Sequence, residues 1–315
     1  MRRYDAVVRV LITGGAGFIG SHLCDTYVGR GDEVVAIDNL TSGRLENVSH
    51  LGDEARFTMV EGDIRHAPEV PGAFDLVLHF ASPASPPFYM DHPLLSLETG
   101  SIGTQWALDV AKEHSARFIV ASTSEVYGDP EIHPQTEDYW GNVNPNGPRS
   151  VYDEAKRYAE AITAAYRRSF GVNTGMVRIF NTYGPRMRAD DGRVVTNFIN
   201  QALEGTPLTV YGDGSQTRSF CYVSDLVAGI VRLADSAEGD PVNIGNPGEF
   251  TMLELAQEVL DLTGSSSELV HEDLPTDDPT RRRPDITRAQ AVLGWSPTVE
   301  LRAGLQATIE HFRGL

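Results

Sequence analysis

The sequence predicts an α/β protein with a doubly wound parallel sheet and a smaller mixed α/β region at its C-terminal end. Two observations support this prediction. Up to residue 180, apolar stretches typical of buried strands alternate with stretches of helical periodicity, the pattern of repeated βαβ units. Beyond residue 180, the chain changes to arginine-rich loops and shorter elements. We therefore expect two regions, 1–180 and 181–315, with a partial return of the chain to the first region around residues 215–245.

The composition argues against several classes of protein. A formal net charge of −18 disfavours binding to nucleic acid or to anionic membranes, so an anionic ligand needs a local cluster of arginines. The two cysteines, Cys24 and Cys221, give neither a disulfide framework nor a zinc spacing, and we predict no metal site. No apolar run approaches the roughly 18 residues of a membrane helix, and the first residues lack a signal-peptide pattern. We expect a cytoplasmic protein without a membrane partner.

Six strands are predicted in the first region, at residues 7–12, 33–37, 57–60, 75–80, 117–121 and 173–180. Helical periodicity follows the first strand up to about residue 30 and recurs at 94–114 and 149–170. Because strands alternate with helices, we expect crossover connections and parallel strands throughout. Residues 81–90 follow the fourth strand and contain three prolines, which predicts a rigid loop at a carboxyl strand end.

A glycine-rich turn joins the first strand to the first helix. After Thr13, glycines recur at positions 14, 17 and 20. Glycines at this spacing allow a tight turn, close approach of the backbone to a pyrophosphate, and packing of the helix on the strand. The N-terminus of the helix attracts the phosphates. The turn predicts a Rossmann-type dinucleotide site formed by Gly14, Gly17, Phe18, Ile19 and Gly20.

The second strand ends at Asp38, 18 residues after Gly20. An acid at this distance is placed to bind a ribose 2′-hydroxyl and repels a 2′-phosphate, so we predict NAD rather than NADP. Arg44 is near enough in the sequence to accept that phosphate, which leaves NADP open. After the third strand, Asp63 is placed to face the adenine. The remaining residues of the predicted cofactor site are Asn39, Ile64, Ala81, Tyr152 and Lys156.

Tyr152 and Lys156 are four residues apart on a predicted helix and therefore share one face. A nearby ammonium group lowers the pKa of a phenol by roughly one to three units, which makes Tyr152 a candidate base near neutral pH. Lys156 is one of two lysines beside 24 arginines, so the chain keeps an amine of adjustable pKa here. The fifth strand delivers Ser122, Thr123 and Glu125 to the same edge of the sheet.

The second region contains shorter elements. We expect a helix ending near residue 204, a strand and turn at 208–214, and a strand ending near 222. Ser224 is the expected N-cap of a helix starting near residue 225, and two more helices are expected at 251–262 and 301–312. We interpret this region as a lid over the first region and not as a separately folding domain.

Longer stretches identify a family resemblance. The glycine turn and the Tyr152–Lys156 pair are typical of short-chain dehydrogenase/reductases, and the chain resembles the extended members of that family over nearly its whole length. More narrowly, it is similar to the UDP-glucuronate decarboxylases, or UDP-xylose synthases. The stretches that carry the narrower resemblance are residues 82–90 (SPASPPFYM), 122–130 (STSEVYGDP), 133–149 (HPQTEDYWGNVNPNGPR), 179–195, 208–220 (LTVYGDGSQTRSF), 282–286 (RRPDI) and 293–295 (LGW).

This resemblance implies a redox-neutral reaction with one retained NAD. Thr123 and Tyr152 would hold the 4-hydroxyl of the sugar, and Tyr152 would take its proton while hydride passes to NAD. Lys156 would lower the pKa of the tyrosine and bind the nicotinamide ribose. The resulting 4-ketone is β to the C6 carboxylate, so CO2 leaves readily, and protonation at C5 and hydride return at C4 give UDP-xylose. Glu125 and Arg282 are expected at the C5/C6 end, with the source of the C5 proton left open.

The resemblance also implies a site for the nucleotide-sugar in the second region. Arg186, Arg193 and Arg218 are expected to face the UDP, because arginine can bind phosphates with two parallel hydrogen bonds. Tyr211 is expected to pack on the uracil. The full expected set is Tyr89, Asn181, Arg186, Arg193, Tyr211, Gln216, Arg218 and Arg282.

Glu125 bears on the choice between related enzymes. The similar dehydratases have Asp-Glu after the threonine, whereas this chain has Ser124-Glu125 and lacks the acid for elimination at C6. Many 4-epimerases have a small residue in place of the glutamate. A UDP-glucuronate 4-epimerase, a decarboxylase that releases a 4-keto pentose, and a non-catalytic NAD-binding sensor remain the alternatives.

Two further expectations come from the resemblance. Similar proteins usually have Asn-Thr where this chain has Gly100-Ser101, which puts local support of the cofactor helix in doubt. Similar proteins also pair the helices near 94–114 and 149–170 into a homodimer. Apolar positions compatible with such an interface, or equally with core packing, are Ala107, Val110, Ala111, Ala161 and Ala165.

Overall fold

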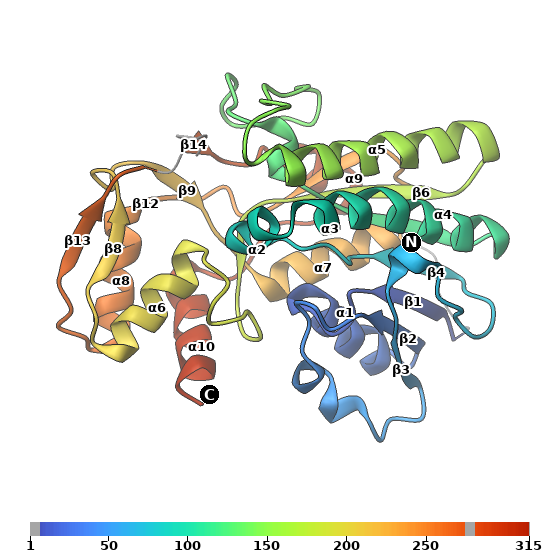
Figure 1. Cartoon of the computed structure of the whole chain (residues 1–315), viewed down its shortest axis with the longest axis horizontal. Helices are drawn as coiled ribbons and strands as arrows, with labels where there is room; N and C mark the ends of the chain where they lie inside the picture. The colour runs from blue at the N-terminus through green and yellow to red at the C-terminus, as the bar shows by residue number, and fades with distance from the viewer. Residues whose placement is uncertain (1–6, 275–280, 315) are drawn as a thin grey trace.

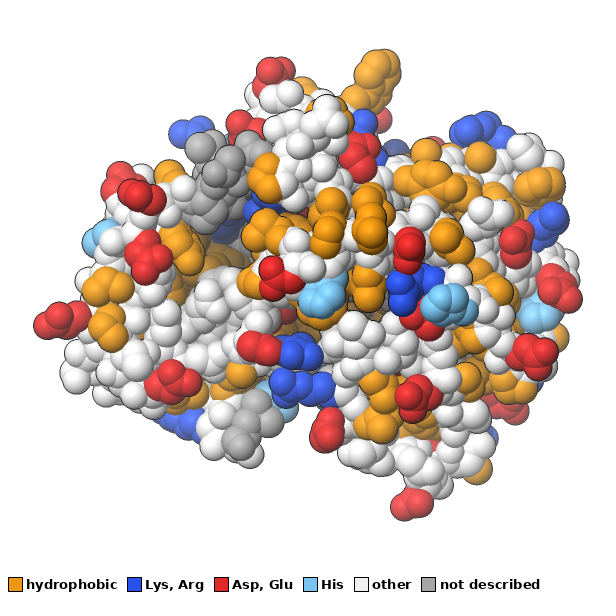
Figure 2. Space-filling model, in the orientation of Figure 1, with side chains coloured by type: hydrophobic (Ala, Val, Ile, Leu, Met, Phe, Trp, Pro, Cys, Tyr) orange, Lys and Arg blue, Asp and Glu red, His pale blue; other side chains and the backbone are white. Residues whose placement is uncertain are grey.

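The computed structural model describes residues 7–274 and 281–314. A seven-stranded sheet with helices on both faces forms the larger part of the molecule (Figure 1). A smaller region built on helices α6 (Val194–Glu204), α8 (Met252–Thr263) and α10 (Leu301–Arg313) lies beside it. Acidic side chains are scattered over the visible surface (Figure 2), in keeping with the net charge of −18. The predicted α/β class is confirmed.

The main sheet is parallel throughout and has the order β11-β6-β5-β4-β1-β2-β3. The chain starts near the middle of the sheet and winds outward in both directions, which is the doubly wound Rossmann-type topology that the sequence predicts. The six predicted strands are present, with ends shifted by one or two residues. The strands are β1 Arg9–Thr13, β2 Glu33–Asp38, β3 Phe57–Glu61, β4 Leu76–His79, β5 Arg117–Thr123, β6 Thr174–Ile179 and β11 Pro241–Ile244. Sequence periodicity did not predict β11.

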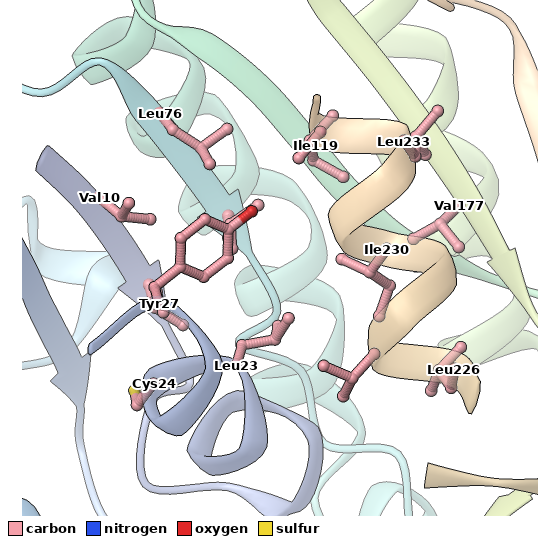
Figure 3. Packing of buried hydrophobic residues seen from close by; sticks show 14 of the residues in the cluster. Val10, Leu23, Cys24, Tyr27, Leu76, Ile119, Val177, Leu226, Ile230 and Leu233 are labelled. Carbon is pink, nitrogen blue, oxygen red and sulfur yellow. The ribbon is translucent and has the colours of Figure 1, made fainter. Parts of the chain in front are cut away.

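One face of the sheet packs against α1 (Phe18–Gly29), α7 (Val223–Ala234) and α9 (Thr287–Leu293). Figure 3 shows this contact, in which Leu23 and Tyr27 of α1 and Ile230 of α7 approach the strands. Each fully buried aliphatic or aromatic side chain of this kind contributes about 1.5–3 kcal/mol. The other face is covered by α4 (Thr104–Glu113) and α5 (Ser150–Phe170). Both faces are therefore buried, as a parallel sheet requires.

The segment between β4 and β5 differs from its prediction. The predicted rigid loop contains helix α2 (Pro86–Asp91), because proline is well suited to the first turn of a helix, where no backbone donor is needed. The single helix expected at 94–114 begins as α3 (Pro93–Glu98), widens into a π-helical turn at Thr99–Gly103, and continues as α4. A Cβ atom placed on Gly100 would lie 2.6 Å from the Cβ of Ala155 on α5. The segment at Gly100 therefore packs directly against Ala155 and supports α5 without a side chain at position 100.

The second region has its own hydrophobic core between α6, α8 and α10. Its strands form three small sheets, one with the order β12-β9-β14 and two pairs, β10-β7 and β13-β8. Their bounds are β7 Thr182–Tyr183, β8 Leu208–Tyr211, β9 Thr217–Ser219, β10 Cys221–Tyr222, β12 Glu249–Thr251, β13 Leu269–Glu272 and β14 Arg281–Arg282. The expected cap by Ser224 is wrong: α7 begins at Val223 after the N-cap Tyr222, without a capping side chain. Thr251 instead caps α8 in a capping box with Glu254.

Short 3-10 turns connect several of these elements, at η1 Leu45–Asn47, η2 Ser49–Leu51, η3 Ile64–His66 and η5 Ser124–Tyr127. Turn η5 follows β5 directly and carries Glu125. Within residues 7–274 and 281–314, no helix is both long enough and apolar enough to cross a bilayer.

The five apolar positions that suit either a dimer interface or core packing divide between the two. Ala107, Val110 and Ala111 are buried against the sheet and belong to the core. Ala161 is exposed and Ala165 is half-buried. The large apolar residues of this helical layer that are exposed include Leu94, Ile102 and Tyr158, and also Phe170 at the end of α5. In Figure 2, hydrophobic side chains gather over α3, α4 and α5.

Asp225 holds the segment before α10 against α7. Its buried carboxylate accepts hydrogen bonds from the backbone N–H groups of Thr298 and Val299, both at 2.8 Å, and from the Thr298 hydroxyl at 2.9 Å. We expect Asp225→Ala to lower the free energy of unfolding by about 3 kcal/mol, because hydrogen bonds to a charged group are lost and buried donors are left unsatisfied. Urea unfolding measures this change. The exposed Asp53→Ala is the control, and an equal effect of both variants would contradict the expectation.

Candidate active site

A cavity of about 730 Å³ lies between the carboxyl ends of the main strands and the second region. Its wall includes the glycine turn after β1, Asp38 after β2, Ala81 after β4 and Thr123 at the end of β5. The second region contributes residues from Asn181 onward. The edge of the sheet at which parallel strands end is where α/β proteins bind ligands.

The glycine turn leaves no room for side chains. Gly14 has a φ of 72°, and a Cβ atom on Gly20 would lie 2.0 Å from the carbonyl oxygen of Gly14. The N-terminus of α1 has no capping side chain, since its N-cap is Gly17. Free backbone N–H groups and the helix dipole therefore point to this end of the cavity, an arrangement that suits a pyrophosphate.

Asp38 supports the turn and faces the cavity. One carboxylate oxygen accepts a hydrogen bond from the backbone N–H of Ala16 at 3.1 Å, and the other accepts one from Leu40 at 2.8 Å. Burial raises the pKa of Asp38, and hydrogen bonds from the backbone oppose this rise. Arg44 is not among the residues that line the cavity, and its charge acts on Asp190. This arrangement favours a ribose hydroxyl over a 2′-phosphate next to Asp38.

Asp63 is engaged by neighbouring side chains on the wall of the cavity. Its carboxylate forms an ion pair with Arg65 at 2.7 Å and accepts a hydrogen bond from Asn39 at 3.1 Å. Hydrogen bonding by Arg65 is the main reason that the pKa of Asp63 is well below its ordinary value. Ile64 follows on the same wall.

Lys156 and Tyr152 lie one above the other on α5. The Lys156 ammonium group donates a hydrogen bond to the carbonyl of Ala121 at 2.8 Å and lies 5.6 Å from the centroid of the Tyr152 ring. Burial lowers the pKa of Lys156 to about 8. Burial also raises the pKa of Tyr152, assisted by the charge of Glu125 and opposed by a hydrogen bond with Thr123. The expectation that the pKa of Tyr152 lies below its ordinary value is therefore wrong for the protein alone.

Tyr89 forms the other side of the Tyr152 pocket. It comes from α2, and its ring stacks on Tyr152 with centroids 5.0 Å apart and an interplanar angle of 8°. Its hydroxyl is buried without a hydrogen-bond partner, and burial raises its pKa to about 12. This hydroxyl is therefore a protonated donor on the cavity wall.

Glu125 sits between two guanidinium groups. Arg282 donates to both of its carboxylate oxygens, at 2.5 and 2.9 Å, and Arg149 donates at 3.1 Å. Burial acts to raise the pKa of Glu125, but the two arginines outweigh it and the pKa lies below its ordinary value. Glu125 is therefore ionised at neutral pH. The pair is buried, with 14% of the Glu125 side chain and 6% of the Arg282 side chain exposed.

Comparison with known proteins shows the family. The GDP-mannose 4,6 dehydratase family model matches residues 11–308. UDP-glucuronic acid decarboxylase 1 of Danio rerio is 53% identical over 96% of this chain and 72% of that protein. UDP-glucuronic acid decarboxylase 3 of Arabidopsis thaliana is 52% identical over 97% of this chain and 89% of that protein. The chain belongs to the extended short-chain dehydrogenase/reductases, in the group of the UDP-glucuronic acid decarboxylases.

A solved relative has a similar fold. The UDP-glucuronic acid 4-epimerase of Bacillus cereus, in complex with UDP-glucuronic acid and NAD, is 29% identical. It superposes with a TM-score of 0.87 over 97% of this chain and 99% of its own. Proteins similar to this chain thus include both decarboxylases and a 4-epimerase.

All residues that were predicted to bind the nucleotide-sugar line the cavity, and so do all residues that were predicted to bind the cofactor. The nucleotide-sugar residues are Tyr89, Asn181, Arg186, Arg193, Tyr211, Gln216, Arg218 and Arg282. Arg186 and Arg193 each have a protein partner, Asp25 at 2.7 Å and Asp191 respectively. A phosphate would share these guanidinium groups with the carboxylates. Gln216 donates a hydrogen bond to the carbonyl of Tyr211 at 2.7 Å, which holds these two residues together.

Sequence reasoning missed two residues near Glu125. Arg149 is the N-cap of α5, and its position in the sequence predicts only the start of the helix. Asp153 follows Tyr152, is 7% exposed, and has one carboxylate oxygen buried without a hydrogen-bond partner. Burial, with the nearby charge of Glu125, raises the pKa of Asp153 to about 7. Helical spacing places Arg149 and Asp153 on one face, four residues apart, but gives no sign that the face is buried.

Asp153 makes stability depend on pH. The folded protein keeps a proton on Asp153 up to about pH 7, whereas an unfolded chain releases it near pH 4, so the unfolding free energy falls as pH rises through this range. We expect Asp153→Asn to remove this fall, a difference of a few kcal/mol at most since one pKa unit corresponds to about 1.4 kcal/mol. Urea unfolding at several pH values measures it. Glu154→Gln is the matched control, and parallel pH profiles for wild type and Asp153→Asn would disprove the assignment.

Proposed function

We propose that the protein converts UDP-glucuronate to UDP-xylose and CO2 with a retained NAD. The observation that carries this proposal is the buried Glu125–Arg282 pair beside Tyr152 in the cavity of a chain that is about half identical to UDP-glucuronic acid decarboxylases. The tyrosine serves oxidation at C4, and the ion pair lies where the acid group of the sugar can be bound. When bound, NAD would supply the hydride acceptor for oxidation at C4, the hydride donor for the reduction after CO2 loss, and a positive charge in its oxidised form.

The cofactor residues fit NAD. The glycine turn has no space for side chains and exposes the N-terminus of α1, and Asp38 lines the cavity where a ribose is expected. The residues that would hold the cofactor are Gly14, Gly17, Phe18, Ile19, Gly20, Asp38, Asn39, Asp63, Ile64, Ala81, Tyr152 and Lys156. On this basis residues 1–180 bind mainly the dinucleotide, and residues 181–315 bind mainly the nucleotide-sugar.

Tyr152 and Thr123 act on the 4-hydroxyl of the sugar. Tyr152 starts protonated, because burial raises its pKa, and Thr123 shares a hydrogen bond with it. Deprotonation needs positive charge nearby, and Lys156 with a pKa of about 8 supplies part of it. Tyr152 then accepts the proton of the 4-hydroxyl and later returns it.

Glu125, Arg282 and Arg149 act at the C5/C6 end. Glu125 is ionised and has no proton to give, so the proton that replaces CO2 at C5 comes from solvent water. Their role is electrostatic. The two arginines attract the carboxylate of the sugar, whereas the negative charge of Glu125 repels it. Loss of CO2 relieves this repulsion, since the remaining charge moves to the C4 oxygen near Tyr152.

Two finer assignments complete the proposal. Leu94, Ile102 and Tyr158 form an exposed apolar face over α3, α4 and α5 that suits a homodimer, and we expect a dimer mass in solution by light scattering. Leu94→Asp with Tyr158→Asp should shift that mass to a monomer, and a monomeric wild type would reject the dimer.

We also assign the protein to the cytoplasm, in keeping with the buried free thiols of Cys24 and Cys221, and cell fractionation tests this assignment.

The function is tested with purified protein, NAD and UDP-glucuronate. We expect CO2 and UDP-xylose in equal amounts. UDP-galacturonate without CO2 would establish the 4-epimerase instead, and CO2 with a 4-keto pentose and accumulating reduced NAD would establish the releasing decarboxylase. Binding of NAD without any turnover would leave the sensor.

The division of roles predicts different defects in different variants. Tyr152→Phe should slow the formation of reduced NAD and of CO2 together, by about 10²- to 10⁴-fold, because proton removal at C4 precedes both. Glu125→Gln and Arg282→Ala should slow CO2 release by at least about 10-fold while reduced NAD still forms, since they act after oxidation. Stopped-flow absorbance and trapped CO2 measure the two steps. Wild-type CO2 release in both Glu125→Gln and Arg282→Ala would refute the assignment.

A further inference from the structure

Residues 133–141 (HPQTEDYWG) are distinctive in the sequence, yet the proposed reaction uses none of them. They lie in the long connection between β5 and α5, outside the residues that line the cavity. Within this segment, Gln135 has an exposed fraction of 0%, although it is polar and lies in a loop. A buried amide must have its hydrogen bonds satisfied, so its partners indicate its role.

The partners of Gln135 belong to the segment that carries Arg282. The Gln135 side-chain oxygen accepts a hydrogen bond from the backbone N–H of Arg283 at 2.8 Å. The backbone N–H of Gln135 donates to the carbonyl of Arg283 at 2.9 Å, and its carbonyl accepts from the N–H of Asp285 at 2.9 Å. The side-chain amide donates to the carbonyl of Ile132 at 2.8 Å and closes its own loop. Gln135 thus holds both backbone polar groups of Arg283.

Asn243 on β11 fixes this clamp to the main sheet. Its side-chain amide donates to the carbonyls of Gln135, at 3.0 Å, and Asp285, at 3.1 Å. Its side-chain oxygen accepts a hydrogen bond from the Tyr127 hydroxyl at 2.8 Å. Asn243 is fully buried and all three of these contacts are inside the protein. The clamp therefore has a rigid base in the seventh strand.

Arg282 immediately precedes the clamped residue. It pairs with Arg218 in the β14–β9 ladder, and its carbonyl accepts a hydrogen bond from the hydroxyl of Ser219 at 3.3 Å. Its guanidinium group reaches Glu125 with two hydrogen bonds. A two-hydrogen-bond contact of this kind requires a fixed backbone, because a displacement of about 1 Å can cost on the order of 10²-fold in rate.

We propose that Gln135 is a positioning residue, which clamps Arg283 and thereby sets the Arg282 guanidinium group against Glu125 for the loss of CO2. This inference rests on the proposed function, because it assigns Arg282 to the step after oxidation at C4. Gln135 touches none of the residues Thr123, Tyr152 and Lys156 through these hydrogen bonds, so oxidation at C4 is independent of it.

The test is Gln135→Met, which keeps the length of the side chain and removes its hydrogen bonds. We expect CO2 release from UDP-glucuronate to slow by about 10- to 100-fold while the first-turnover formation of reduced NAD stays within about 2-fold of wild type. Trp140→Ala is the matched control, because Trp140 lies in the same connection and is 91% exposed. The control should keep both rates.

A double-mutant cycle separates positioning from general stability. In an Arg282→Ala background, Gln135→Met should slow CO2 release no further, because the group that it positions is absent. Full additivity of the two changes, equal losses in both steps, or no loss in either step would overturn the inference. If Gln135→Met does not fold, Gln135→Asn replaces it with the same expected result, since its amide is one methylene too short to accept from the N–H of Arg283.

Wild-type protein assayed alongside keeps the two proposals apart. Absence of CO2 from wild type would reject the proposed function and, with it, the role of Gln135 in that step. If wild type releases CO2 and the Gln135 variant keeps the wild-type ratio between the rate of CO2 release and the rate of formation of reduced NAD, the positioning role alone is rejected.

Discussion

The contact between Glu125 and the two arginines joins parts of the chain that are far apart in sequence. Glu125 follows β5, Arg149 begins α5, and Arg282 comes from β14 in the second region. Taking three charges out of water is costly, and only close hydrogen bonding compensates for it. The contact therefore exists only if the sheet end, the helix start and the second region are all in place. In this protein, the geometry of the site and the docking of the two regions depend on the same three charged side chains.

Local patterns in the sequence were sufficient to predict the elements whose structure depends on neighbouring residues. Apolar strands, helical periodicity and the glycine turn predicted six strands of the main sheet and the end of the sheet where Asp38 lies. The seventh strand, β11, is four residues long and pairs with β6 across more than 60 residues of intervening chain, so no local signal distinguishes it. Helix α2 and the π-helical turn were missed because proline and glycine usually mark breaks, whereas here tertiary packing accommodates them.

The site was predictable in its members but not in its electrostatics. The Tyr152–Lys156 spacing places the two side chains together, yet burial shifts both pKa values toward the neutral forms, which spacing cannot reveal. The family resemblance placed Glu125 and Arg282 at the same end of the sugar, but their ion pair, between residues 157 positions apart, was not predicted. Arg149 and Asp153 were missed because a charged residue in the first turn of a helix is usually solvated. Their partners come from distant parts of the chain: Arg149 donates a hydrogen bond to Glu125, and the charges of Glu125 and Arg282 act on Asp153.

The close approach of Gly100 to Ala155 links two positions that are distant in the sequence. The Cβ atom of Ala155 would lie only 2.6 Å from a Cβ atom at position 100, which is too close for both to be present without a shift. An asparagine at 100 therefore fits only after residue 155 becomes smaller or the helix shifts, and the two substitutions are epistatic. In an evolving lineage, the order of these two changes would be constrained, because the wrong first step would push α5, with Tyr152 and Lys156, away from the sheet.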